Sequence, residues 1–388
     1  MVDKVEVRES QLVQLSMMWR YRIKSYSCNT LKLKALFYFA ALFLNFLTVN
    51  AQEDYIIVHL HNGREDAYPI NAVDSVTFTR STTAKNSTSQ YKRLKILCIG
   101  NSFTLDAMSY APFILKDIAP EVELTIGCAY IGGACLAQQL ASITGSTIVL
   151  DNNTYSPKDY IFYLYENNAN RWTNKGEMNA PNILDYTDWD IITLQQLSSQ
   201  SWQDYETFYS PVIHKLQMAI AKRVHNIQLG WILTSGANSQ DESVQYGHWE
   251  KSAQNSYRVM NETGMSVLFC YGTAIQNLRT TDINERGDGG GFTADGSHLQ
   301  EGIGCLCASY CMVVKMLEIV GYNSKTIIGN TIRPNRQWIN ERNVPEKNYG
   351  ESGKDGVIGI TERNCLLAQI AAIQACKSPF LVSNIDKP

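Results

Sequence analysis

From residue 91 onward the chain alternates short apolar runs with longer stretches in which apolar residues recur every three or four positions. The runs have the length of buried strands, and the stretches have the period of amphipathic helices. We expect strands at 95–99, 122–129, 188–194, 227–234 and 266–271, and helices at 107–118, 135–142, 211–223, 252–264, 302–320 and 361–376. Such alternation predicts an α/β fold, with a mostly parallel sheet covered by helices on both faces.

The segment 148–185 interrupts this alternation. Aromatic and aliphatic residues alternate from Tyr160 to Tyr165, and an Asn-rich turn then leads into Arg171-Trp172-Thr173. This pattern predicts an inserted β-hairpin. Its aromatic side chains either form a wall on which a sugar stacks or pack on the domain, and the sequence leaves both interpretations open.

The first ninety residues have a different pattern. Lys32 and Lys34 precede an apolar run at 35–47, and small residues follow at 49–51, which is typical of an export signal. We expect a signal peptide region at 1–51, a small β appendage at 52–80, a Ser/Thr/Asn-rich linker at 81–90 and one large domain at 91–388. The protein would then be periplasmic or extracellular. No stable membrane span would remain, although an uncleaved tail anchored in the membrane is an alternative.

Charge and cysteine content narrow the function classes. The formal net charge is −3 and long Lys/Arg runs are missing, so we expect no nucleic-acid partner. Removal of Cys28 with the signal leaves nine of the ten cysteines, so at least one thiol stays unpaired. No CxxC pair or Cys/His spacing typical of zinc occurs; we expect most cysteines to be core residues and no metal to be bound.

A candidate nucleophile follows the first strand of the large domain. Gly100-Asn101-Ser102 separates the apolar run 96–99 from the next helical stretch, which predicts a sharp turn from strand to helix. A serine at such a corner can attack a carbonyl group, because nearby backbone N–H groups can stabilise the oxyanion that forms. The alternative is that Ser102 or Asn101 merely caps the helix.

A candidate base lies near the other end of the chain, in Asp295-Gly296-Ser297-His298, just before a late helix. An Asp three residues before a His can accept the imidazole Nδ1–H, which leaves Nε2 free to take a proton from a serine. An Asp cap beside an incidental His is the alternative interpretation. Among the other histidines, His248 is the rival base.

These two motifs, in this order, resemble blocks one and five of the SGNH (GDSL-type) esterase superfamily. Tyr130-Ile131-Gly132-Gly133 and Leu194-Gln195-Gln196-Leu197-Ser198 resemble the two intermediate blocks, so the resemblance extends over roughly 92–315. It implies a three-layer, flavodoxin-like fold. Two positions depart from the superfamily pattern: Asn101 stands where Asp is usual, and Gln195 stands where Asn is usual.

The resemblance also implies roles for individual residues. Ser102 would be the nucleophile, His298 the base and Asp295 the carboxylate that orients it. The N–H groups of Ser102 and Gly133 and a side-chain amide, from Gln195 or Gln196, would bind the oxyanion. No metal or cofactor would be required.

The expected function is that of an exported serine esterase, a carboxylic ester hydrolase. Polar and aromatic insertions favour an acylated carbohydrate, or a small-molecule ester, from which an O-acetyl group is removed. Tyr130, Trp202 and Trp249 lie in expected loops and would contact this substrate. A lipid or thioester hydrolase of the same fold and a non-catalytic glycan-binding module are the alternatives. The oligomeric state stays open.

Overall fold

The computed structural model of the chain describes residues 2–7, 55–60, 65–69, 93–167, 169–236, 239, 241–284, 292–293, 295–300, 302–332 and 358–385. The chain divides into two compact units, Met1–Asn86 and Ser87–Pro388. The division falls within the stretch expected to be a linker.

In the first unit, strands β1 (Val2–Val7), β2 (Tyr55–Leu60) and β3 (Glu65–Pro69) form an antiparallel sheet in that order. Strand β1 was not expected, since it comes from the segment interpreted as a signal region. The apolar run 35–47 and the expected linker 81–90 lie outside the described residues. Signal cleavage after residue 51 would remove β1, and it stays a prediction.

The second unit is built on a seven-stranded sheet in the order β12-β11-β10-β4-β5-β8-β9. Its strands are β4 (Arg93–Gly100), β5 (Glu123–Tyr130), β8 (Tyr160–Glu166), β9 (Arg171–Met178), β10 (Ile191–Leu194), β11 (Gln228–Ile232) and β12 (Val267–Phe269). The five strands from β12 to β5 are parallel, and β8 and β9 continue the sheet in antiparallel pairing. Taken in chain order, the parallel strands have the 2-1-3-4-5 arrangement of flavodoxin-like sheets. A two-stranded sheet, β6 (Ile148–Leu150) and β7 (Asn153–Tyr155), stands apart.

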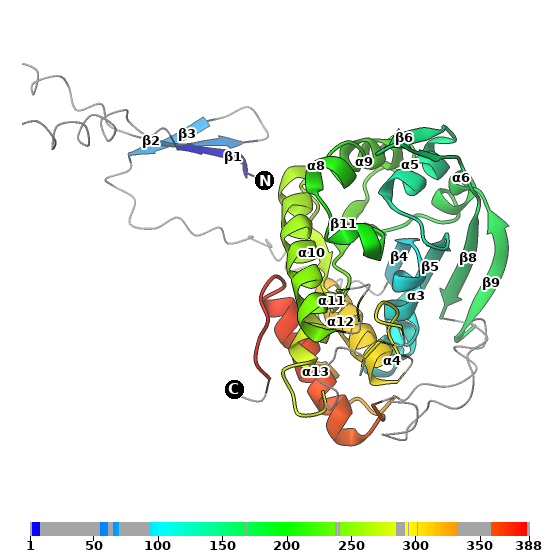
Figure 1. The fold of residues 1–388 in the computed structure, drawn as a ribbon, viewed down its shortest axis with the longest axis vertical. Coiled ribbons are helices and arrows are strands. Elements are labelled where there is room, and N and C mark those ends of the chain that lie inside the picture. Colours follow the sequence, from blue (N-terminus) through cyan, green and yellow to red (C-terminus); the bar gives the residue numbers. More distant parts are fainter. Residues whose placement is uncertain are drawn as a thin grey trace, which may run out of the picture. The chain divides into compact units, whose positions relative to one another are not determined.

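Helices flank this sheet, as Figure 1 shows. They are α3 (Ser102–Met108), α4 (Ala111–Ile118), α5 (Leu136–Thr144), α6 (Ala180–Leu184), α7 (Ser198–Ser201), α8 (Tyr205–Phe208), α9 (Ile213–Ala221), α10 (Glu242–Thr263), α11 (Tyr271–Leu278), α12 (Ile303–Ile319) and α13 (Glu362–Lys377), with a 3-10 turn at Ser324–Ile327. The predicted three-layer α/β fold is confirmed. Several helices differ from expectation. The stretch 107–118 is divided between the end of α3 and the helix α4, and α10 begins ten residues before the expected start at 252. Helices α6, α7, α8 and α11 were not expected.

The two faces of the sheet bury separate cores. Along β4, Leu94, Ile96 and Cys98 join one cluster, which also contains residues of α3, α4, α11, α12 and α13. The alternate residues Leu97 and Ile99 join the other cluster, with α5 and α9. This alternation places helices on both sides, because successive strand residues point to opposite faces. Among the described helices, none is long and apolar enough to cross a bilayer.

The expected hairpin is confirmed as β8 and β9, which pair along most of their length. It extends the main sheet instead of standing apart from it, because β8 pairs with β5. Tyr160, Phe162 and Tyr165 are buried, and Trp172 packs against the core. These aromatic residues therefore pack on the domain and do not form an exposed wall.

A close backbone approach at Gly272, in the first turn of α11, yields a test of this packing. A Cβ atom added there would lie 2.0 Å from the Thr234 carbonyl oxygen, whereas one added at Gly247 in α10 would meet nothing within 4 Å. We expect Gly272→Ala to lower the free energy of unfolding by about 2 kcal/mol or more, as overpacking does. The matched change Gly247→Ala should raise it by about 0.5–1 kcal/mol, because Ala favours a helix over Gly. Denaturant unfolding of both variants measures the difference, and equal effects would contradict the close approach.

Candidate active site

The turn that carries Ser102, called the nucleophile turn after the role expected of that residue, begins where β4 ends at Gly100. Asn101 has extended backbone and caps α3, since its side-chain Oδ1 accepts a hydrogen bond from the Phe103 N–H at 3.1 Å. Ser102 is therefore the first residue of α3, and its hydroxyl lies in a partly buried position. The strand-to-helix corner predicted for this stretch is confirmed.

The Asn101 amide does more than cap the helix. It is buried, and its Nδ2 donates to the Ala134 carbonyl at 3.0 Å, in the loop that follows β5. A carboxylate has no hydrogen to donate. An amide at this position, unlike a carboxylate, thus allows a bond between the nucleophile turn and the neighbouring loop.

Three side chains form one hydrogen-bonded chain at this corner. Ser102 Oγ lies 2.8 Å from His298 Nε2, and His298 Nδ1 lies 2.7 Å from Asp295 Oδ2. An ionised carboxylate only accepts, so Nδ1 carries the proton and Nε2 accepts the Ser102 O–H. Residues 196 positions apart in the chain thus meet in the geometry of a nucleophile, a base and an orienting acid.

The turn that carries Asp295 and His298 is fixed locally. Asp295 Oδ1 accepts the backbone N–H groups of Ser297 at 2.9 Å and His298 at 2.7 Å. Thr293 and Leu299, which flank the turn, form an isolated antiparallel bridge. Asp295 Oδ1 thereby stabilises the turn, and Asp295 Oδ2 binds the imidazole.

Two buried polar side chains that the sequence analysis missed anchor this turn from outside. Asp106 in α3 accepts the Leu299 N–H at 3.1 Å, and Gln245 in α10 donates to the Gly296 carbonyl at 2.9 Å. The Gln245 side-chain oxygen in turn accepts a hydrogen bond from Arg279. A polar Asp within the apolar stretch of α3 was a signal for the first. Gln245 gave none, because its partner is 51 residues away.

The loop after β5 lies beside the nucleophile turn. The Ile131 N–H donates to the Gly100 carbonyl at 3.2 Å, and Ala134 bonds Asn101, so Gly133 lies between two fixed points. Gly133 has a φ of 62°, which favours glycine. Within the described part of the chain, no hydrogen bond occupies its N–H.

The expected roles of the two glutamines need correction. The Gln195 side chain is fully buried; it accepts from Thr104 Oγ1 and donates to Asn101 Oδ1 at 2.5 Å. Gln196 is also buried, with its oxygen on the Leu136 N–H and its nitrogen on the Phe208 carbonyl. Both amides therefore support the framework beneath the site, and neither is exposed to a substrate.

The three residues expected to contact substrate have different positions. Tyr130 is half-buried and lies opposite Gly100 in the β4–β5 register, next to the nucleophile turn. Trp202 is half-buried and stacks on His248, with ring centroids 4.0 Å apart. Trp249 is only 2% exposed and belongs to a core cluster, so its expected substrate contact is wrong. His248 and Trp249 lie in α10 and not in a loop, because the helix starts earlier than expected.

Asp295, the carboxyl group at the end of the hydrogen-bonded chain, is stabilised in its charged form. Partial burial disfavours the Asp295 carboxylate, but the hydrogen bonds from the His298 ring and from the His298 and Ser297 N–H groups outweigh that effect. The pKa of Asp295 is therefore lower than its ordinary value of 3.8. The folded state binds this proton more weakly than the unfolded chain. Its contribution to stability is thus complete above about pH 4 and is lost as the pH falls through the folded pKa.

We expect His298→Ala to raise the pKa of Asp295, because it removes the side-chain hydrogen bond that stabilises the carboxylate. Carbon-detected NMR of the labelled carboxyl groups during a pH titration measures this change. Asp204 is the matched control, because its pKa is lowered by Thr207, and not by a histidine. An unchanged Asp295 titration in the variant would contradict the bond to His298.

Comparisons with known proteins place the chain in a family. None of the curated proteins matches the sequence. Among solved structures, it is similar to a DUF4886 family protein from Bacteroides uniformis ATCC 8492, at 22% identity over 76% of this chain and 99% of that chain, with a TM-score of 0.58. It is also similar to a catalytic mutant of an acetylxylan esterase from Geobacillus stearothermophilus, at 11% identity over 62% and 97% of the two chains, with a TM-score of 0.36. The family model described as "Domain of unknown function (DUF4886)" matches residues 95–347, well over half of the chain, and the chain therefore belongs to the DUF4886 family.

Proposed function

We propose that this protein is an exported serine esterase of the SGNH type that removes O-acetyl groups from carbohydrate. The observation that carries the proposal is the hydrogen-bonded chain Ser102–His298–Asp295, with distances of 2.8 and 2.7 Å. It lies at the carboxyl end of β4, where the order of the parallel strands reverses between β4 and β10. Flavodoxin-like sheets bind their ligands at this point.

Acylation follows from the positions of these atoms. Ser102 Oγ attacks the ester carbonyl carbon while His298 Nε2 takes the hydroxyl proton. The imidazolium that forms is stabilised by Asp295, whose lowered pKa keeps it a carboxylate at neutral pH. His298 then donates the proton to the leaving sugar oxygen, and the C–O bond breaks to leave an acetyl group on Ser102.

Deacylation repeats these steps with water. His298 takes a proton from a water molecule that attacks the acetyl-Ser102 ester, and acetic acid and free Ser102 result. The backbone N–H groups of Ser102 and Gly133 are the proposed donors to the oxyanion in both steps. Each such donor is worth roughly a hundred- to a thousandfold in rate.

The exposure of the site favours a carbohydrate over a lipid. The His298 and Asp295 side chains are 44% and 55% exposed, so the described residues leave the base and its acid open to water. An enzyme gains binding free energy from a long acyl chain only where the chain is buried away from water, at about 0.8 kcal/mol for each CH₂ group. A lipid esterase therefore needs an apolar channel beside its nucleophile. A glycan chain is polar and large, and an open site next to Tyr130 suits it. A lipid or thioester substrate, and a binding module without catalysis, are the outcomes against which this proposal is tested.

We expect the wild type to hydrolyse acetylated sugars and short-chain nitrophenyl esters faster than long-chain esters. Ser102→Ala and His298→Ala should each lose at least about a thousandfold in kcat/KM, because the nucleophile or its base is gone. The matched control His248→Ala removes the rival base and should keep most of the activity. A preference for long chains would support the lipid alternative. An inactive wild type across this panel would support the binding module.

Gln245 offers a second kinetic test, since it touches the catalytic turn without touching the proposed reacting atoms. Gln245→Glu keeps an acceptor for Arg279 but places a second oxygen against the Gly296 and Ser239 carbonyls, which now accept from the Gln245 amide. The turn should shift, and kcat should fall about ten- to a hundredfold with little change in KM.

The control for this test is Gln217→Glu. Gln217 also donates to a backbone carbonyl, that of Thr263, but it lies on α9 and does not contact the turn. The control should keep its kcat. Equal losses of kcat in both variants, or a change in KM alone, would show that Gln245 does not position the turn.

A further inference from the structure

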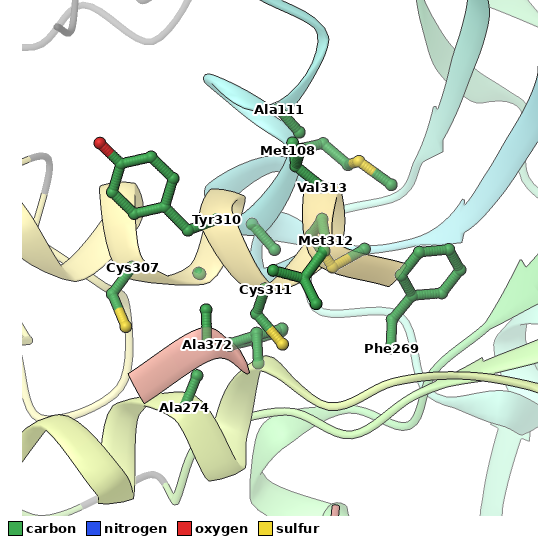
Figure 2. Packing of buried hydrophobic residues seen from close by; sticks show 14 of the residues in the cluster. Met108, Ala111, Phe269, Ala274, Cys307, Tyr310, Cys311, Met312, Val313 and Ala372 are labelled. Atoms are coloured by element: carbon green, nitrogen blue, oxygen red, sulfur yellow. The ribbon is translucent and has the colours of Figure 1, made fainter. Parts of the chain in front are cut away.

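Three cysteine side chains converge in the core that lies between the sheet and helices α11, α12 and α13. Cys270 follows β12, Cys311 lies in α12, and Cys376 lies near the end of α13. The Cys311 sulfur is 3.9 Å from the Cys270 sulfur and 3.9 Å from the Cys376 sulfur, and all three lie within 4.8 Å of one another. Figure 2 shows Cys311 in the apolar cluster that also holds Phe269 and Ala372.

The distances between these sulfur atoms fit a shared metal ion better than a disulfide. Thiolates bind zinc-like ions at about 2.3 Å, so three of them around one ion in a plane are about 4.0 Å apart. The two separations from the Cys311 sulfur, 3.9 Å each, are close to this value, and the third is no more than 4.8 Å. A disulfide requires a sulfur–sulfur distance of about 2.05 Å, so any pair would have to approach by almost 2 Å.

The local charge fits as well. Lys315 lies one turn after Cys311, on the same face of α12, and its ammonium pairs with Glu318 at 2.6 Å. Three thiolates and one divalent cation carry a net charge of −1, and the Lys315 ammonium, although it also pairs with Glu318, is close enough to Cys376 and Cys270 to interact with their sulfur atoms electrostatically.

We propose that Cys270, Cys311 and Cys376 bind one thiophilic divalent cation, Zn²⁺ or Cd²⁺, as three thiolates. Binding forms three metal–sulfur bonds and releases three protons, one from each thiol, with no change of oxidation state. Cys376 is the half-buried member, so the ion enters from its side. The ion ties α12 and α13 to the end of β12 and stabilises the C-terminal part of the domain. This site is separate from the proposed esterase site and does not depend on it.

Titration of the purified, reduced protein with Cd²⁺ tests the proposal, because cadmium–thiolate bonds absorb in the ultraviolet. We expect one Cd²⁺ to bind per chain, with a rise in the midpoint of thermal unfolding. Cys376→Ser and Cys311→Ala should lose this stoichiometric uptake. Cys307→Ser is the matched control, since it removes an equally buried thiol of α12 outside the cluster, and it should bind as the wild type does.

Three results would overturn the proposal. The first is a wild type that takes up no stoichiometric Cd²⁺ and shows no shift in thermal unfolding, which decides the question even if a cysteine variant fails to fold. The second is unchanged uptake in Cys376→Ser. The third is a mass two hydrogens lower than expected for the isolated, unreduced protein, together with a peptide that links two of these three cysteines, which would show a disulfide instead.

Discussion

The buried amide of Asn101 connects the chain segments on which the candidate site depends. Its oxygen accepts from the backbone of α3 and from Gln195 after β10, and its nitrogen donates to Ala134 after β5. These bonds join the ends of three adjacent parallel strands, because β4 lies between β10 and β5 in the sheet. Together with the bond from the Ile131 N–H to the Gly100 carbonyl, this side chain holds Ser102 in position relative to the Gly133 loop. Breaking the hydrogen bonds of a buried amide costs free energy, because water cannot replace the lost partners. The corner is therefore rigid.

His298, the proposed base, comes to the Ser102 corner from a different part of the fold. His298 is carried by a short turn and not by a strand or helix, so its position depends on the groups around it. Asp295 fixes the ring from within the turn, and Asp106 and Gln245 fix the turn from α3 and α10. Because Asp106 lies in the same helix as Ser102, one helix carries the proposed nucleophile and holds the backbone next to the proposed base. These bonds hold the His298 and Asp295 side chains in place although both side chains are open to water.

The two cores explain why the remaining elements lie where they do. Helix α12 is buried on nearly all sides and contacts α3, α4, α11 and α13, so it forms the centre of one layer. Apart from the three proposed metal ligands, the cysteines of this layer pack as small apolar side chains. The proposed metal site uses three thiols of this layer, at positions 41 and 65 residues apart, and no spacing rule reveals such a set.

The sequence by itself determined the strand and helix alternation, the corner at Ser102 and the Asp295–His298 turn. These are local: the period of apolar residues reports the element, and an Asp three residues before a His reaches it within a single turn. Only the tertiary structure decided what each side chain touches. Gln195 turns inward beneath Asn101, and Trp249 lies in the core because α10 begins earlier than its apolar period suggested. Two contacts depend on strands and helices that are distant in sequence: the hydrogen bond between Ser102 and His298, and the hydrogen bond from Gln245 to the turn. Their packing, which no local pattern records, brings those side chains together.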